Sequence, residues 1–519
     1  MRKSQLIAIL IAVLSAISSY GQTGLRPRGD VNCDWEVGIA DVNVLVDAVL
    51  EGVDYHPFYT YAYDINGDKE INLADINLIV DAVLGGQLMP LPSYSGTLPV
   101  LYINTEGYRD IVSKDEYLQA EWWLDASPST GDARFCVSRS DTGYESIGSA
   151  DEPLGMQIKG RGNYTWRMYD KKSFRLKLDD KQPLMGMHSN RHWCLMAHPD
   201  DFLARLKNTM GFEMSRRIGL AYTPAQEPVE VVLNGQYIGL YFLTEKIRVD
   251  KHRVNIEEQT DGETNPDKIT GGWLLEITNV HEDNTLYFLE QQENDRWLGV
   301  TPESPENLSW HQERYIRNFI QKTNDAIYTD DTTSTEWEKY IDIDALAKYY
   351  IVGEIMDDLE HFAGSCYMHK HRGDSTKLIF GPVWDFGNAF QRWAIYGDTE
   401  FNKFIYQQPT SFNNHWIEKI AQFPHFQQVV KEHWQDFYES DFNGLDLDGF
   451  IDEFVESIRP AYQADAARWK QRDIESEKKN FKNFIHRKID WLNSQWGKPQ
   501  LIPTNLNSHL KKNDNLELL

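Results

Sequence analysis

Residues 348–370 read KYYIVGEIMDDLEHFAGSCYMHK, and residues 377–390 read KLIFGPVWDFGNAF. The apolar residues up to Ile355 predict the end of a helix, which runs into a loop rich in carboxylates. Two short apolar segments follow, beginning at Tyr367 and Leu378, with a polar turn between them, which is typical of a β-hairpin. The predicted order is therefore helix, acidic loop, hairpin and a second acidic turn.

The acidic loop contains Asp358 and Glu360, and the second turn contains Asp385. Because the two ends of a hairpin meet, we expect these carboxylates to lie close together, although Glu360 and Asp385 are 25 residues apart. Phosphoryl-transfer sites hold a catalytic base and magnesium with carboxylates arranged in this way. We therefore take Asp358 and Glu360 as candidates for the base loop and Asp385 as a candidate magnesium ligand.

The composition is that of globular protein, since 41% of the 519 residues are hydrophobic and 13% are aromatic, enough for more than one core. The 52 basic and 79 acidic residues give a formal charge of −27. This balance argues against nucleic acid or an anionic membrane as a partner, because each requires a basic face. The four cysteines are widely spaced, which leaves one disulfide, such as Cys136–Cys194, open.

The first 21 residues have the pattern of a secretory signal peptide. Arg2 and Lys3 precede an apolar run from Leu6 to Ile17, and small residues flank a cleavage position before Gln22. No other stretch approaches the ~18 consecutive apolar residues of a spanning helix. We expect a secreted protein, extracellular or associated with the cell surface, with no membrane span.

Residues 29–52 and 63–86 repeat each other with an offset of 34 residues. Each copy places side-chain oxygens at positions 1, 3, 5 and 12 of a calcium loop, and the carbonyl of position 7 completes the set. These positions hold Asp30, Asn32, Asp34, Glu36 and Asp41 in the first copy and Asp64, Asn66, Asp68, Glu70 and Asp75 in the second. Position 6, normally glycine, is Trp35 in one copy and Lys69 in the other.

An amphipathic helical pattern follows each loop, so the unit is predicted to be a small all-α domain over residues 26–87. Duplicated half-EF-hands of this size resemble a type I dockerin. The resemblance implies Ca²⁺ binding and a cohesin domain on a scaffold protein as the partner. The alternative is a helical hairpin with no metal. Residues 88–97 are predicted to be a linker by their composition.

From residue 98 the pattern is rich in strands, and after about residue 309 it is mostly helical, which predicts an α+β domain over residues 98–497. The strand KKSFRLKL at 171–178 alternates, with Phe174 on a core face and Lys177 on a cationic face. The glycine turn around Arg161 precedes it, so this cationic face suits a polyphosphate.

Glu213 lies in a predicted helix, LKNTMGFEMSRRIG at 206–219. Protein kinases pair a strand lysine with a helix glutamate, so we expect a pair between Lys177 and Glu213, the alternative being a surface glutamate. An Asn-Gly hairpin then leads into Glu245 and Lys246, where a kinase hinge would meet adenine. Lys246 has a second interpretation, as a ligand of the phosphates.

The motifs KGRGNYTW, KKSFRLKL, LKNTMGFEMSRRIG, LNGQYIGLYFLTEKI and GPVWDF follow one another along the chain. Together they resemble the CotH (spore-coat protein H-like) family of atypical protein kinases over roughly residues 98–497. The resemblance implies a two-lobed kinase-like fold that uses ATP and Mg²⁺. It implies Asp385 as the magnesium ligand, and it places Arg161, Lys177, Asn208 and Lys246 around the nucleotide.

Two positions depart from the family pattern. Gly387 stands where many members have the second acid of W-D-x-D, and Asp358-Leu359-Glu360 stands where they have an aspartate in an N-x-D type loop. The leading interpretation is a secreted, scaffold-anchored kinase that transfers the γ-phosphoryl of ATP to protein hydroxyls. The first alternative is a non-catalytic, cell-surface or cellulosome-associated binding protein.

The second alternative, suggested by the dockerin resemblance alone, is a polysaccharide-degrading enzyme, which needs two carboxylates about 5–10 Å apart. Three histidines, His361, His369 and His371, lie near the acidic loop, and they are interpreted as metal ligands or as solvated loop residues. Residues 498–519 are predicted to be a polar tail.

Overall fold

The computed structural model describes residues 24–498 apart from 89–90, 128–143, 281, 292–295, 392–401, 409–412 and 443–444. The predicted signal peptide and the polar tail after Lys498 lie outside the described residues, as does Cys136. Cys194 is a free, buried thiol. Within the part of the chain that the structure describes, no helix is both long and apolar enough to span a bilayer.

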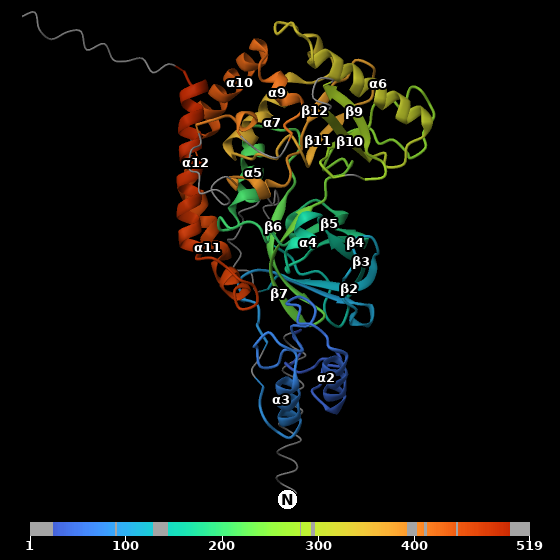
Figure 1. Ribbon diagram of the computed structural model, residues 1–519, viewed down its shortest axis with the longest axis vertical. Helices are drawn as coiled ribbons and strands as arrows, with labels where there is room; N and C mark the ends of the chain where they lie inside the picture. Colours follow the sequence, from blue (N-terminus) through green and yellow to red (C-terminus); the bar gives the residue numbers. More distant parts are fainter. Residues whose placement is uncertain are drawn as a thin grey trace, which may run out of the picture.

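A seven-stranded barrel forms the middle of the molecule (Figure 1). Its strands are β1 (Val100–Thr105), β2 (Leu118–Asp125), β3 (Leu154–Arg161), β4 (Ser173–Gln182), β5 (Asn190–Met196), β6 (Gln226–Leu233) and β7 (Gln236–Glu245). The order around the barrel is β1-β2-β3-β4-β5-β7-β6, and a parallel pairing of β1 with β6 closes it. The predicted Asn-Gly hairpin is confirmed as β6 and β7.

Alternation of side chains builds the barrel core, as the sequence pattern of β3 and β4 predicts. Ile158, Phe174 and Leu176 point inward and are at most 1% exposed. Their neighbours Lys159 and Lys177 point outward and are half-buried. The outer face of these two strands is therefore cationic, on the side that the sequence indicates.

A second, five-stranded sheet with the order β12-β11-β8-β10-β9 lies beyond the barrel (Figure 1). Its strands are β8 (Trp273–Ile277), β9 (Leu286–Gln291), β10 (Arg296–Ser304), β11 (Cys366–Lys370) and β12 (Leu378–Phe380). The helices are α4 (Tyr164–Met168), α5 (Leu206–Arg217), α6 (Trp310–Ile327), α7 (Ile343–Ile355), α9 (Trp416–Ile420), α10 (Pro424–Phe437), α11 (Leu447–Asp465) and α12 (Ile474–Trp496). The α+β class predicted from the sequence is confirmed.

Two stretches of the C-terminal half each contain two helical elements. The segment from 336 to 355 consists of the 3₁₀ turn η3 (Glu336–Lys339) and α7, because Asp342 caps the start of α7 by accepting from Ala345 N. The segment from 416 to 438 consists of α9 and α10, because Pro424 begins a new helix at its first position.

The duplicated loops form a small helical unit at one end of the molecule, with α2 (Ile39–Glu51) and α3 (Leu73–Val83) packed together through Leu45 and Ile79 (Figure 1). The two loops have the same conformation. In both, the first aspartate accepts from backbone N–H groups four and five residues later, and position 6 has φ 70°. Trp35 and Lys69 therefore take the left-handed backbone that glycine normally supplies there.

This N-terminal unit packs directly against the end of the barrel. Arg26 N donates to Gly235 O at 2.8 Å, and Trp35 Nε1 donates to the Tyr108 hydroxyl at 3.1 Å. Phe58 is 6% exposed and belongs to the barrel core. Arg468, which follows α11, donates to Phe58 O at 2.9 Å, so the C-terminal helices hold the same joint.

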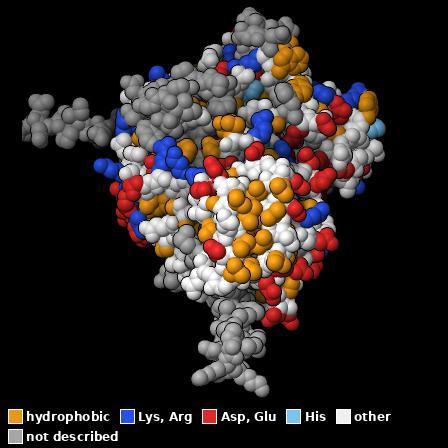
Figure 2. Space-filling view, turned by 60° about the horizontal axis from the view of Figure 1, so that its bottom comes forward, with side chains coloured by type: hydrophobic (Ala, Val, Ile, Leu, Met, Phe, Trp, Pro, Cys, Tyr) orange, Lys and Arg blue, Asp and Glu red, His pale blue; other side chains and the backbone are white. Residues whose placement is uncertain are grey.

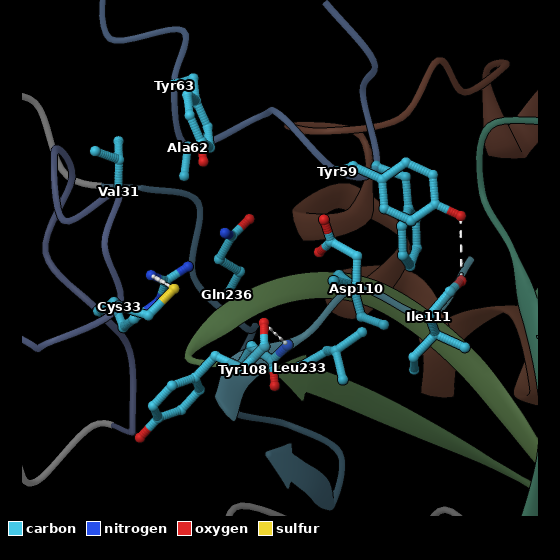
Figure 3. Close-up of a pocket in the computed structure, with 14 residues that line it drawn as sticks. Val31, Cys33, Tyr59, Ala62, Tyr63, Tyr108, Asp110, Ile111, Leu233 and Gln236 are labelled. Carbon is cyan, nitrogen blue, oxygen red and sulfur yellow. Dashed lines mark hydrogen bonds between the residues drawn. The ribbon is translucent and has the colours of Figure 1, made fainter. Parts of the chain in front are cut away.

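A cavity of about 100 Å³ remains at this joint, lined by the unit, by the turn around Tyr108 and by the β6–β7 hairpin (Figure 3). Tyr59 bridges one side of it by donating from its hydroxyl to Ile111 O at 3.2 Å. Within the segment 88–97, Ser95 lies on the barrel, where its N and Oγ donate to the buried Glu230 carboxylate.

Candidate active site

The acidic loop and the turn that carries Asp385 lie side by side, as the hairpin pattern predicts. Asp358 and Ala389 form an antiparallel bridge between the two segments. Asn388 donates from its side-chain amide to one oxygen of Glu360, so the two segments are also joined through side chains. The expectation that Glu360 and Asp385 approach each other through the hairpin is therefore confirmed.

A buried ion triad fixes the start of the acidic loop. Lys488 of α12 places its Nζ 3.1 Å from a Glu354 oxygen and 2.9 Å from Asp357 Oδ1, and all three side chains are 0% exposed. The Lys488 amine also donates to Lys403 O at 2.9 Å. Because Glu354 lies in the last turn of α7 and Asp357 lies just beyond it, this triad sets where Asp358 and Glu360 begin.

The Asp385 turn is held by α5. Asp385 has φ 61° and caps the 3₁₀ turn η4 (Phe386–Asn388). Asn208 accepts from Phe386 N at 3.1 Å, and Lys207 Nζ donates to Gly387 O at 2.7 Å. Asn208 is 4% exposed, so in this structure it positions the turn.

The barrel contributes cations to the same place. The Arg161 guanidinium lies 5.0 Å from the ring of Trp384, the residue before Asp385. Lys246, just after β7, lies 3.8 Å from Glu303 of β10. Desolvation lowers the pKa of Lys246, and Glu303 opposes that effect. Arg161 and Lys246 therefore face the carboxylates across the boundary between the barrel and the second sheet.

The side chain of Asp385 is exposed to solvent, yet many protein atoms surround it. Its side chain is exposed, yet burial among surrounding atoms, together with the nearby Asp200 charge, raises its pKa to about 6. Burial raises the pKa of Glu360 to about 7, with added repulsion from Asp385 and Asp358. From these two properties of Asp385, an exposed side chain with many protein atoms around it, we infer that it lies in a recess, where charges interact more strongly than in bulk water.

Further residues at the recess were not indicated by any sequence motif. Burial raises the pKa of Glu276 on β8 to about 8, with repulsion from Glu303. Asn279 donates from its side chain to Glu360 at 2.6 Å. Asp200, between β5 and α5, lies beside Asp385. These side chains come from separate segments, so only the fold brings them together.

The predicted pair between Lys177 and Glu213 is wrong. Glu213 of α5 instead forms ion pairs with Arg216 and Arg217, which lie three and four residues further along the same helix, the second pair at 2.5 Å. Lys177 lies on the outer face of β4, opposite His192 of β5. The lysine–glutamate pair that the structure does contain at the recess is Lys246 and Glu303.

The Glu245 side chain has structural partners. Its carboxylate accepts from the Tyr222 hydroxyl at 2.9 Å and from Ala225 N at 3.1 Å, and it lies 3.8 Å from Arg253. These contacts give the carboxylate a structural role at the end of β7, and the contact of the backbone groups here with adenine stays a prediction.

The three histidines are engaged in other contacts. His361 and His369 are buried and bond the backbone carbonyls of Tyr349 and Gly381, so the interpretation of these two as solvated loop residues is wrong. His371 pairs with Glu257 at 3.3 Å. In the described ranges, no three His, Cys, Asp or Glu side chains are grouped to hold a metal ion. Magnesium at a nucleotide site needs only one or two carboxylates, since phosphates and waters complete its shell.

A family model described as CotH kinase protein matches residues 158–492. The chain belongs to this family. The CotH match begins in β3 and ends in α12, so it includes Arg161, Lys246, the acidic loop, Asp385 and Lys488. The first two barrel strands and the N-terminal unit lie before the CotH match. A search of curated proteins found no match.

Proposed function

We propose that this CotH kinase protein transfers the γ-phosphoryl of ATP to a hydroxyl group of another protein, with Mg²⁺ as cofactor. The observation that carries the proposal is the convergence of Asp385, Glu360 and Arg161 on one recess, although they come from three separate segments. When bound at Asp385, Mg²⁺ neutralises charge on the phosphates. The donor chemistry fits, because a carboxylate oxygen is a preferred magnesium ligand.

Glu360 is the proposed general base. It would take the proton of the acceptor hydroxyl while that oxygen bonds to the γ-phosphorus and the bond from phosphorus to the β–γ bridging oxygen breaks. Asn279 and Asn388 hold both carboxylate oxygens by hydrogen bonds, which fixes the orientation of the group. A pKa of about 7 suits a base that works near neutral pH.

Arg161 and Lys246 are the proposed phosphate ligands. Both are partly accessible on the barrel side of the recess, and both carry a positive charge toward the acidic side. Guanidinium and ammonium groups in a desolvated setting stabilise the charge that spreads over the transferring phosphoryl oxygens. The stacking of Arg161 on Trp384 would keep its guanidinium beside the metal ligand.

The N-terminal unit supports a second part of the proposal, that the protein is exported and binds Ca²⁺ and a cohesin through a dockerin-like domain. The four large apolar side chains that are most exposed on the described part of this unit form two pairs related by the 34-residue repeat: Ile39 (73%) with Leu73 (65%), and Leu50 (79%) with Leu84 (80%). Figure 2 shows hydrophobic side chains gathered on this end of the molecule. Exposed apolar groups of this extent are typical of a protein-binding surface.

Nucleotide binding tests the enzymatic part. Thermal unfolding of the full chain is followed with ATP, with MgCl₂ and with both, for the wild type, for Asp385→Asn and for Asp151→Asn, an exposed aspartate far from the recess residues in the chain. Mg²⁺ with ATP should raise the melting temperature of the wild type and of Asp151→Asn, and the shift should be lost in Asp385→Asn. A shift that Asp385→Asn retains would remove the mechanism.

A measurement of phosphoryl transfer distinguishes a kinase from the non-catalytic binding protein, the alternative suggested by Gly387. The full chain is incubated with Mg²⁺ and ATP, and phosphoryl groups gained by the chain or by an added protein are counted by intact-mass spectrometry. The kinase proposal expects incorporation that Glu360→Gln reduces and Asp385→Asn abolishes. Nucleotide binding without incorporation would favour a binding protein that retains the recess.

A further inference from the structure

Gly387 lies against a carboxylate from another part of the chain. A Cβ built at Gly387 would lie 2.6 Å from Asp200 Oδ2 and 3.2 Å from Asp385 Oδ1. The Asp200 carboxylate therefore fills the space that a side chain at position 387 would need. The same two distances place the Asp200 and Asp385 oxygens within about 6 Å of each other, the range over which carboxylates share an environment.

Lys207 holds the two segments together through backbone contacts. Its Nζ donates to Gly387 O at 2.7 Å and to Asp200 O at 3.4 Å. The next residue in the loop, Asp201, is committed to the start of α5, because its two oxygens accept from Leu203 N and Lys207 N. Of the two adjacent aspartates, one is therefore structural and the other is turned toward the Asp385 turn.

The Asp200 carboxylate, unlike that of Asp201, makes no structural contact among the described residues. Among the described residues, no hydrogen bond or ion pair engages it, and the Lys207 amine donates to backbone carbonyls. Asp385 accepts a long bond, 3.4 Å, from Gly387 N. Two neighbouring carboxylates that lack a cation repel each other, and a bound divalent cation removes that repulsion.

We propose that Asp200, in the loop before α5, is the second protein ligand of the metal at Asp385. Its carboxylate takes the place of the acidic side chain that Gly387 lacks. The inference rests on the proposed function, since it concerns the same Mg²⁺ and nucleotide. The preferred ligand is a hard divalent cation carried by a nucleoside triphosphate, because oxygen ligands from one or two carboxylates and from phosphates are the set that such a cation takes.

The placement of Asp200 against Gly387 gives a relocation experiment. If metal binding requires a carboxylate in this space, whichever residue carries it, then removing the carboxylate at position 200 and introducing one at position 387 should preserve metal binding. Gly387 tolerates a side chain in its backbone conformation, because its φ is outside the left-handed region. The Asp200→Ala change removes the oxygen that a Cβ at 387 would meet.

Mn²⁺ serves as the probe, since its binding with ATP to the full chain is measured directly by electron paramagnetic resonance of the free ion. The variants are Asp200→Asn, the double variant Asp200→Ala/Gly387→Asp, Asp385→Asn, and Asp151→Asn as the matched surface control. Far-ultraviolet circular dichroism confirms that each variant is folded. We expect Asp200→Asn to weaken Mn²⁺ binding by about 10- to 100-fold, the double variant to recover it, and Asp151→Asn to match the wild type.

The outcomes separate this inference from the proposed function. If Asp200→Asn binds Mn²⁺ with ATP as the wild type does while Asp385→Asn does not, Asp200 is not a ligand and the proposed function stands. If Asp200→Asn binds Mn²⁺ weakly and the double variant binds it equally weakly, the Asp200 carboxylate acts through its own loop. The inference that Asp200 takes the place of an acidic side chain at position 387 is then refuted. If the wild type binds no Mn²⁺ with ATP, both the function and the inference fail.

Discussion

The Lys488 triad predicts that replacing one amine in α12 should destabilise the protein severely. In Lys488→Met the side-chain length is kept, but the carboxylates of Glu354 and Asp357 lose the cation that lies 3.1 Å and 2.9 Å from them. All three side chains are fully buried, so water cannot replace the amine. Removing one partner of a buried ion pair costs about 3–5 kcal/mol, and here two carboxylates are left facing each other.

The cost should depend on pH in a defined direction. Burial already raises the pKa of Glu354 while Lys488 is present, and loss of the amine raises it further. A carboxyl group whose pKa is raised in the folded state keeps a proton that the unfolded chain releases, so stability is lost as pH rises above the unfolded value of about 4.5. The destabilisation of Lys488→Met should therefore be smaller near pH 5 than near pH 8.

Urea unfolding of the full chain measures the effect, through the midpoint at unchanged slope. Lys482→Met is the matched control, because Lys482 lies in the same helix and pairs with Asp452 at 2.8 Å on the surface. A surface pair is worth about 0–1 kcal/mol, so this variant should unfold close to the wild type. The reasoning is refuted if the two variants lose the same stability, or if the loss in Lys488→Met is independent of pH.

Three further outcomes follow from the structure. In EDTA, the free energy of unfolding of Glu360→Gln should rise relative to the wild type as pH rises from 4.5 to about 7, by up to about 3 kcal/mol. The reason is that burial raises the pKa of Glu360 over that interval. A difference in unfolding free energy that stays constant with pH contradicts this. Arg468→Met should leave the Phe58 carbonyl without its donor and speed proteolytic cleavage between the N-terminal unit and the barrel, whereas Arg459→Met, which removes the ion pairs with Glu456 and Glu475, should not. Lys69→Gly should tighten Ca²⁺ binding measured by calorimetry, because it removes about 1 kcal/mol of left-handed strain at φ 70°; unchanged or weaker binding argues that the residue already tolerates the turn.

The local features of the candidate site were readable from the sequence, and the global ones were not. The approach of Glu360 to Asp385 follows from a hairpin of neighbouring segments, which is a local pattern. Closure of the barrel depends on a parallel pairing of Val100 with Glu230, residues 130 apart, for which a strand pattern carries no signal. Asp200 was missed for the same reason, since its neighbour Gly387 is remote in the chain.

The wrong pair was avoidable from the sequence. Glu213 has arginines three and four residues later, at positions that face it on a helix, and these local partners satisfy it before any strand lysine can. The position of Glu245 at the end of β7 follows from the strand pattern, whereas the direction of its side chain depends on Tyr222 and Arg253, which only the tertiary structure supplies.

The joint at Arg26, Trp35 and Arg468 also fixes the orientation of the barrel relative to the N-terminal unit. Because Phe58 is built into the barrel core and hydrogen bonds cross the joint from both termini of the chain, a force applied to α2 and α3 passes straight into the barrel. The recess therefore has a fixed orientation relative to the N-terminal unit. If that unit is the anchor and the recess transfers phosphoryl groups, as proposed, an acceptor protein has to approach in that orientation, which restricts the set of acceptors before any sequence recognition.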